Sequence, residues 1–428
     1  MDKLFQLKAH DTTIGREFSA GLISYITVVY IIIVNATILS AAGIPLEAGI
    51  IATILTVFAG CLLMGFWSNT PILVIPGMGL NAMFTYTIVQ SGGFAWQEAL
   101  AMVFVSGVIF MVLAFTPLAK TIVTSIPDSL KEAITVGIGI LLILIGFDNS
   151  GIITNSDHTL LAIGDLSSST ALITLIGLVV TVVLFIKNVP GNLLLSIAFT
   201  ATLAFLFGDF RSNGASWSMP SFGGYMSVFG QMSFAKAGDF VFWLTAFSLA
   251  MVVIFENIGL IHGHTKMLNQ THKSKKALQA NAISVATAGI FGTSPTVASV
   301  ESAAGIAAGG RTGLTSIVTG LLFLASIVLI PVIKIVPESA VSPVLILIGV
   351  LMLQNITNIK LDDLLESFPA LLIIVLIPLT YSIADGMAIG FILYPLMKLL
   401  MGKGKEIQPA LYMIALLFLG NFVLQYAL

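Results

Sequence analysis

Two glutamates in otherwise apolar segments are the residues of this chain best suited to chemistry. Glu256 is flanked on both sides by apolar residues, and Glu301 stands in a run of Gly, Ser, Thr and Ala. An ionised carboxylate is costly in lipid unless it is paired, and the sequence places no Lys or Arg at a similar depth. We therefore predict that Glu256 is protonated part of the time, as proton coupling requires. The alternative is a permanently protonated glutamate that joins two helices.

The stretch 289–310 (GIFGTSPTVASVESAAGIAAGG) is predicted to be a broken membrane segment that lines a site. Pro295 interrupts helical hydrogen bonding, and unpaired backbone groups at membrane depth are tolerated only where protein or water covers them. The small residues would let a ligand approach the backbone. A half-helix after the break would direct its N-terminal N–H groups, and Glu301, into the same cavity as Glu256. The alternative is a helix-packing seam of small residues.

A second break, TPILVIPGMGLNAMFTY, occurs in the first half of the chain. It combines an extended β-branched run with Pro76, two glycines and Asn81 at the start of the next helical stretch. Asn81 carries both a hydrogen-bond donor and an acceptor, so substrate contact and helix capping are equally weighted roles for it. Four other side chains, polar or aromatic, are candidates to line the same cavity: Thr27, Tyr30, Asn35 and Phe255.

The composition excludes an ordinary soluble protein. The chain is 57% hydrophobic and 9% charged, with a mean hydropathy of +1.05, whereas soluble domains carry about a quarter charged residues. The net charge of -2 argues against a nucleic-acid partner, and the single Cys61 excludes an internal disulfide. No cofactor and no metal are expected, because the nearest candidate ligands, three histidines, are predicted to lie in a hydrated cytoplasmic loop: His262, His264 and His272.

Apolar runs separated by polar or Gly/Pro punctuation predict fourteen membrane spans, in a bilayer of the cell membrane. With the N-terminus inside, all 18 Lys and Arg residues except Arg211, Lys236 and Lys334 fall on the cytoplasmic side. Residues 409–428 form one further apolar helix, which either spans the membrane or lies in its interface. The expected spans are 16–40, 46–66, 70–91, 96–116, 128–147, 169–187, 192–208, 239–262, 276–291, 292–310, 312–333, 341–355, 368–383 and 385–400.

The spans divide into two halves of seven. Residues 1–15 form a cytoplasmic lead-in, and 209–238 is an extracellular connection between the halves 16–208 and 239–400. An odd number of spans in each half places the halves in opposite orientations, which is the pattern of an inverted repeat. Both breaks occur in the third span of their half, and matched breaks indicate a substrate site near the membrane midplane.

The motifs PGMGLNAMFTY and GTSPTVASVESAAGIAAGGRTGLTS resemble the AzgA-like adenine/guanine/hypoxanthine permeases of the nucleobase–cation symporter 2 group, and the resemblance runs nearly end to end. It implies an all-α uracil-permease architecture with core and gate domains, and a short strand in the broken third and tenth spans. It also implies a purine base bound at Asn81, Glu256 and Glu301. Phe255-Glu256-Asn257 departs from the Phe-Asp-Thr most frequent in that family, which affects the choice of purine.

We therefore expect a transporter that imports guanine, hypoxanthine or adenine by proton symport, with an elevator movement of the core. An anion transporter on the same fold is the alternative, which two carboxylates without a buried cation disfavour; an intramembrane enzyme would need a nucleophile and base that the sequence does not show. The partners are the purine and the bilayer, and a homodimer is compatible with this architecture. The predicted substrate-binding residues, with Glu256 also coupling the proton, are Asn81, Phe255, Glu256, Asn257, Thr296, Ser299 and Glu301.

Overall fold

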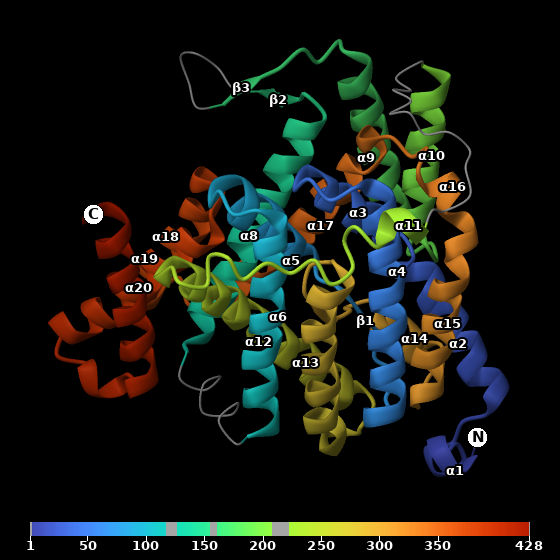
Figure 1. Ribbon diagram of the computed structural model, residues 1–428, viewed down its shortest axis with the longest axis horizontal. Helices are drawn as coiled ribbons and strands as arrows, with labels where there is room; N and C mark the ends of the chain where they lie inside the picture. Colours follow the sequence, from blue (N-terminus) through green and yellow to red (C-terminus); the bar gives the residue numbers. More distant parts are fainter. Residues whose placement is uncertain (1, 117–125, 155–160, 208–221, 428) are drawn as a thin grey trace.

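Helices make up most of the chain, whose computed structural model describes residues 2–116, 126–154, 161–207 and 222–427 (Figure 1). The apolar runs of the sequence become the long helices, because a helix satisfies all of its backbone hydrogen bonds internally. The elements of the first half are α1 (Asp2–Phe5), η1 (Lys8–His10), α2 (Ile14–Val28), α3 (Ile31–Ala41), α4 (Leu46–Leu63), η2 (Met64–Ser68), β1 (Val74–Pro76), α5 (Met78–Ala82), η3 (Met83–Ser91), α6 (Trp96–Phe115), α8 (Asp128–Asn149), β2 (Ile153–Thr154), β3 (Ala162–Ile163), α9 (Ser169–Ile186) and α10 (Asn192–Leu206).

The second half follows the short helix α11 (Phe222–Tyr225). Its elements are α12 (Phe240–Met267), η4 (Thr271–Lys273), α13 (Ser274–Phe291), β4 (Thr296–Ala298), α14 (Ser302–Ala307), α15 (Gly313–Ala325), η5 (Ser326–Leu329), α16 (Ile330–Ile333), η6 (Glu338–Ala340), α17 (Ser342–Leu353), η7 (Gln354–Asn358), α18 (Leu364–Thr380), α19 (Ile383–Leu400), η8 (Gly404–Glu406) and α20 (Pro409–Ala427).

Each expected span has a corresponding element, which confirms the polytopic, all-α fold. Nine helices in the described part of the chain are long and apolar enough to cross a membrane. The shorter helices α10 and α18, the less apolar α13 and the two broken segments account for the other expected spans. The eighth span is longer than expected, because α12 continues past His262 to Met267, and the chain turns only at Asn269, where φ is 55°. Residues 209–221 of the expected extracellular connection, and residues 1 and 208, lie outside the described residues.

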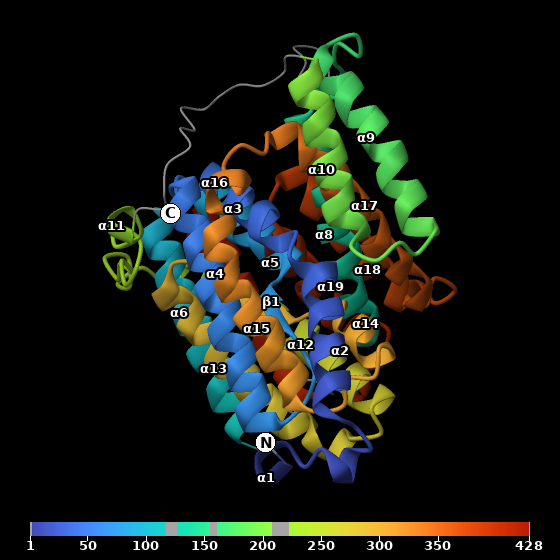
Figure 2. The ribbon, with the colours of Figure 1, turned by 90° about the vertical axis from the view of Figure 1, so that its right-hand side faces the viewer.

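The two breaks meet in the middle of the molecule, where β1 pairs with β4 in antiparallel register (Figures 1 and 2). Ile75 lies opposite Val297, and the backbone N–H of Gly77 donates to the carbonyl of Pro295 at 3.1 Å. Each strand therefore satisfies backbone groups that the interrupted helix of the other leaves unpaired. This pairing confirms the expected strands and brings the half-helices α5 and α14 to the same level.

The helices form two packed groups, and each group contains helices from both halves of the chain. In one group, α4 packs against α13 and α15, α2 against α15, and α6 against α12 and α13. In the other, α8 packs against α17 and α18, α9 against α10 and α17, and α18 against α19. Figure 2 shows α9, α10 and α17 on the opposite side of the molecule from α6 and α13. The C-terminal α20 packs on α19 and α12.

Asn69, just before the first break, ties the two halves together at the end of the first group where the N-terminal segment lies. Its Oδ1 accepts from the N–H of Gly313 at 2.8 Å, and its Nδ2 donates to the carbonyl of Phe5 at 3.1 Å. Lys273 donates from Nζ to the Asn69 carbonyl at 2.8 Å. Burial, reinforced by the charge of Lys276, lowers the pKa of Lys273 to about 8. The chain entering the first break is thus held by residues of the second half.

Candidate functional site

Glu301 lies at the N-terminal end of α14, held by side chains from both halves. The hydroxyl of Tyr30, at the turn between α2 and α3, donates to Oε1 of Glu301 at 2.7 Å. The hydroxyl of Ser299 donates to Oε2, and Ser299 Oγ accepts the backbone N–H of Glu301 at 3.2 Å. The sequence predicted Glu301 inside a half-helix about one and a half turns beyond Pro295. Instead, the strand β4 follows Pro295, and Glu301 begins the half-helix, so its half-buried carboxylate lies at the break itself.

Glu256, on α12, lacks the hydrogen-bond donors that surround Glu301. Its side chain is half-buried and makes no hydrogen bond or ion pair with the residues that the structure describes. Phe255, the preceding residue, is also half-buried. Gly259 and Gly263 follow on the same side of the helix, and a Cβ added at either would meet no atom within 4 Å. The carboxylate of Glu256 therefore borders open space and keeps both oxygens free for a ligand or a proton.

Asn81 is fully buried in α5 and connects the two breaks. Its Oδ1 accepts from the hydroxyl of Ser294, which lies beside Pro295, and its Nδ2 has only the sulfur of Met78, at 3.9 Å, as a partner among the described residues. The capping role considered for Asn81 is not seen, because the N-cap of α5 is Gly77. A donor on Asn81 thus remains for a ligand. Ser294 was not among the predicted site residues, although its place before a proline in the broken segment is the signal that could have found it.

Asn35 extends this buried network into the first span. Its Oδ1 is 3.2 Å from the hydroxyl of Ser294, and its Nδ2 donates to Thr53 at 2.7 Å and to Thr293 at 2.9 Å. All of these partners are buried. Thr27, another expected lining residue, instead donates its hydroxyl to the carbonyl of Ile23 at 2.6 Å. The network therefore holds the first span against the second break, and only Tyr30 of the candidates in this span reaches a carboxylate.

Asn257 and Thr296 support the second break from behind. Asn257 Oδ1 accepts from the backbone N–H of Ala298 at 2.9 Å and from Asn281, while its Nδ2 donates to Val253 at 2.8 Å. The hydroxyl of Thr296 is 3.0 Å from that of Ser284. Both side chains are fully buried, and their hydrogen-bonding groups are used within the protein. The structure thus brings Glu301, Ser299 and Asn81 together at the breaks and places Asn257 and Thr296 in the supporting layer. Phe255 and Glu256 lie on α12, which packs against β4 and α14.

The sequence predicts His264 in a hydrated loop, and this prediction is wrong. It belongs to α12 rather than to a loop, and its ring is only 4% exposed, because the helix continues through the sequence HGHTKM. His262 and His272 are exposed as expected. The described residues contain no group of three or more histidine, cysteine, aspartate or glutamate side chains that could hold a metal ion.

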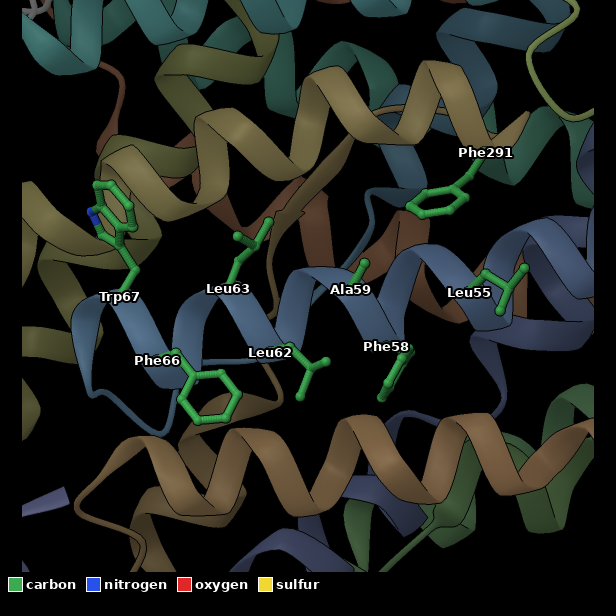
Figure 3. Close-up of a pocket in the computed structure, with 8 residues that line it drawn as sticks. All are labelled: Leu55, Phe58, Ala59, Leu62, Leu63, Phe66, Trp67 and Phe291. Atoms are coloured by element: carbon green, nitrogen blue, oxygen red, sulfur yellow. The ribbon is translucent and has the colours of Figure 1, made fainter. Parts of the chain in front are cut away.

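A separate apolar hollow of about 530 Å³ lies along α4 (Figure 3). Phe58, Leu62 and Trp67 of α4 and η2 line it, and Phe291 closes one end. Its walls carry almost no polar surface, so it offers no partner for the hydrogen-bonding edge of a polar solute. The hollow is therefore not the candidate site, which remains the space beside the two breaks.

This chain is similar to known permeases over nearly its whole length. Residues 15–389 match the family model Xan_ur_permease, described as a permease family. The nucleobase transporter PlAzg2 of Paenibacillus larvae is 49% identical over 387 residues, covering 89% of this chain and 77% of the relative. The guanine/hypoxanthine permease PbuO of Bacillus subtilis is 38% identical, covering 97% and 98%. The adenine permease AdeP of Escherichia coli is 35% identical, covering 99% and 96%.

Solved structures share the fold at low sequence identity. The transmembrane domain of the cyanobacterial bicarbonate transporter BicA superposes with a TM-score of 0.66 at 16% identity, covering 88% of this chain and 96% of that chain. The transporter SLC26A9 gives a TM-score of 0.66 at 14% identity, covering 90% and 66%. At such identities the likeness concerns the arrangement of helices and does not extend to the transported solute.

Proposed function

This chain belongs to the permease family whose model it matches, and we propose that it imports a purine nucleobase into the cell by proton symport. It is a multi-pass membrane permease rather than an intramembrane enzyme, since its relatives are permeases and transporters over nearly its full length. The names of those relatives support guanine, hypoxanthine or adenine as the substrate. The observation that carries the proposal is the pair of carboxylates beside the two breaks, one held by neutral donors and the other unpartnered.

The proposed binding mode uses the hydrogen-bonding edge of the base. Purines present ring and exocyclic N–H groups, and Glu301 and Glu256 are acceptors for them. The Nδ2 group of Asn81 is a donor for a ring nitrogen or a carbonyl oxygen of the base. Phe255 offers an aromatic face beside Glu256 for a flat ring. The donors already on Glu301, from Tyr30 and Ser299, fix the direction of its free lone pairs before the base arrives.

A neutral base suits this site better than an anion. The proposed site contains two carboxylates, and no Lys or Arg is salt-bridged or hydrogen-bonded to either of them in the described part of the chain. An anion placed here would be repelled unless both carboxyl groups were protonated. The sulfate-permease-like alternative therefore lacks the cationic partner that it needs, although the fold itself is compatible with it.

Proton coupling is assigned to Glu256. A carboxyl group without a partner at membrane depth is most stable when protonated. A base that accepts its O–H at a ring nitrogen or a carbonyl oxygen stabilises this protonated form, so the substrate complex binds the proton more tightly, as symport requires. Occupancy and protonation of Glu256 are then linked, and linkage works equally in both directions. Glu301 already has two neutral donors, so its charge is less dependent on a proton.

The two packed groups of helices correspond to the proposed core and gate. Gly79 of α5 packs so closely against Ile138 of α8 that an added Cβ would lie 2.9 Å from it, with Met352 of α17 at 3.7 Å. The first break, and with it the site, thus lies at the boundary between the groups. Movement of the group that carries the breaks past the other would expose the site to each side in turn, as in an elevator.

Uptake into proteoliposomes tests the proposal. Radiolabelled guanine, hypoxanthine and adenine are supplied with the outside acidic, with and without an uncoupler, and labelled sulfate and bicarbonate are supplied in parallel. Accumulation of a purine that collapses on uncoupling is the expected result. Purine entry that ignores the proton gradient would remove the symport mechanism, and uptake of the anions alone would replace the purine with an anion.

The proposed orientation places the N-terminus and the segment 263–276 in the cytoplasm, as the distribution of Lys and Arg predicts. A cysteine at Lys275, which is exposed, should be protected from an impermeant reagent in intact cells after Cys61 is replaced by serine. A cysteine at exposed Ser227 should be labelled under the same conditions. The opposite pattern would invert the orientation.

A further inference from the structure

His264 is a buried side chain that the proposed mechanism does not use. It lies on α12 about two helical turns beyond Glu256 and is only 4% exposed. Its Nε2 is 2.8 Å from the carbonyl oxygen of Ser299. A carbonyl oxygen can only accept, so Nε2 carries the hydrogen. Its Nδ1 is buried without a partner among the described residues. A buried histidine with one nitrogen in a hydrogen bond and the other unpaired needs a structural or functional explanation.

The residue that His264 contacts is fixed on every side. The N–H of Ser299 donates to the carbonyl of Leu73 at 2.9 Å, next to β1, and its carbonyl also accepts the N–H of Ser302 at 3.1 Å. The Ser299 hydroxyl donates to the Glu301 carboxylate and accepts the Glu301 N–H. The orientation of the Ser299 peptide therefore sets the direction from which the Glu301 carboxylate is held.

We propose that His264 is a positioning residue for substrate binding, which fixes the Glu301 carboxylate by donating from Nε2 to the Ser299 carbonyl. The proposal rests on the proposed function, because it assigns His264 to the site where the base binds. The imidazole reaches the turn from α12, the helix that also carries Glu256. One helix thus supplies one carboxylate directly and orients the other through the backbone. Without the imidazole, the Ser299 peptide keeps its bond from Ser302 but loses the one that connects it to α12.

The test uses two substitutions that differ in where they place an amide. In His264→Gln the Nε2 amide lies close to the position of the imidazole Nε2, whereas in His264→Asn the Nδ2 amide lies close to the position of Nδ1. The equilibrium affinity for guanine, hypoxanthine or adenine, whichever the wild type binds, is measured for the full-length protein in detergent, together with the midpoint of thermal unfolding. His262→Ala, at an exposed position two residues away, is the matched control.

We expect His264→Ala and His264→Asn to lose about fivefold or more in affinity, while His264→Gln stays within about twofold of the wild type. In the background of Glu301→Gln, the further loss from His264→Ala should fall below twofold, because both changes act through the same carboxylate. If His264→Ala does not fold, the comparison of Gln with Asn alone decides.

Three results would overturn the inference: unchanged affinity in His264→Ala, equal affinities in the Gln and Asn variants, or a loss from His264→Ala that remains undiminished beside Glu301→Gln. Each leaves the proposed function intact, since the wild type still binds the base. Wild-type protein that binds none of the three purines would instead overturn the proposed function and this inference with it.

Discussion

The two breaks have the same backbone arrangement but different chemistry. Around β1 and α5 the chain is apolar apart from Asn81, and the segment 71–77 is entirely buried. The segment at β4 and α14 carries Glu301, half-buried, and Val300, whose side chain is 64% exposed although it follows a buried strand. The strands pair with each other, so the two breaks are equally necessary for the fold. The first contributes the buried Asn81 to the proposed site, and the second contributes the half-buried carboxylate of Glu301.

The comparison of the two breaks distinguishes residues that the fold needs from residues that the bound solute needs. Pairing β1 with β4 satisfies the backbone of both breaks, and any sequence that forms short strands there would meet that requirement. The charged chemistry comes from the second half, through Glu256 and Glu301. The first half supplies neutral groups: Tyr30 on the Glu301 carboxylate, and Asn35 and Asn81 on Ser294. A fold built from two similar halves therefore carries a site in which the halves have different roles.

The largest effect is expected from neutralising the carboxylate of the second break. Glu301→Gln should lose about 1.5–3 kcal/mol of purine binding, or about 10- to 150-fold in affinity, the range for a hydrogen bond to a charged group. Equilibrium binding of labelled purine measures it. The matched control is Glu98→Gln in the first half, where the carboxylate accepts the N–H of Ala95 at 2.9 Å at the start of α6. Glu98→Gln should lower thermal stability without changing affinity. Near-normal purine affinity in Glu301→Gln would contradict the claim that the second break supplies a carboxylate for binding.

Substitution of Asn257 is expected to lower mainly the stability of the protein, and substitution of Asn81 mainly its affinity for the purine. Asn257→Ala leaves the buried N–H of Ala298 and the amide of Asn281 without their acceptor, so the free energy of unfolding should fall by about 1–3 kcal/mol for each unpaired group. Asn81→Ala should be milder on stability, because Ser294 keeps Asn35 as a partner, and should weaken purine binding more. Thermal unfolding and equilibrium binding of both variants give the answer. Equal effects of both variants on affinity would place Asn257 among the substrate contacts.

A smaller effect is expected where the first half supports the carboxylate of the second. Tyr30→Phe removes the 2.7 Å hydrogen bond to Glu301, and Ser299 still donates to the same carboxylate, so we expect a loss in affinity of about 1 kcal/mol, roughly fivefold. The control is Tyr25→Phe, one turn earlier, whose hydroxyl bonds Ser326 at 2.7 Å. Binding titrations of both variants compare them. Equal purine affinities of Tyr30→Phe and Tyr25→Phe would show that the Tyr30 hydroxyl does not contribute to binding.

Most of the fold was predictable from the sequence because bilayer physics leaves few choices. Apolar runs of sufficient length must be helices, and matched Pro/Gly interruptions must be covered by each other or by water. The order of the spans follows from these two constraints, whereas the short strands in the broken segments were expected only from the resemblance to the purine permeases. The sequence predicts an end of α12 that is too early, because Gly263 and the polar residues around it are typical of a loop. In the structure the buried face of the helix continues through His264 and Thr265.

The site was predictable in its carboxylates but not in its supporting contacts. Glu256 and Glu301 stand out because each is an ionisable residue in an apolar environment. The roles of Ser294, His264 and Asn257 depend on which helices become neighbours, and hydrogen bonds between residues 35 to 259 positions apart leave no local pattern in one sequence. Asn257 follows Glu256 directly, yet a helix directs consecutive side chains about 100° apart, so it supports the break from behind.

The most direct test of the central claim follows the proton itself. Wild-type protein and Glu256→Gln are placed in vesicles that contain a pH-sensitive dye, and purine is added outside without an imposed gradient. The wild type should acidify the lumen as purine enters. Glu256→Gln resembles the protonated form but cannot release a proton, so it should exchange labelled purine across the membrane without acidification. Lumen acidification by Glu256→Gln at the wild-type rate would contradict the assignment of proton coupling to the unpartnered carboxylate of the second half.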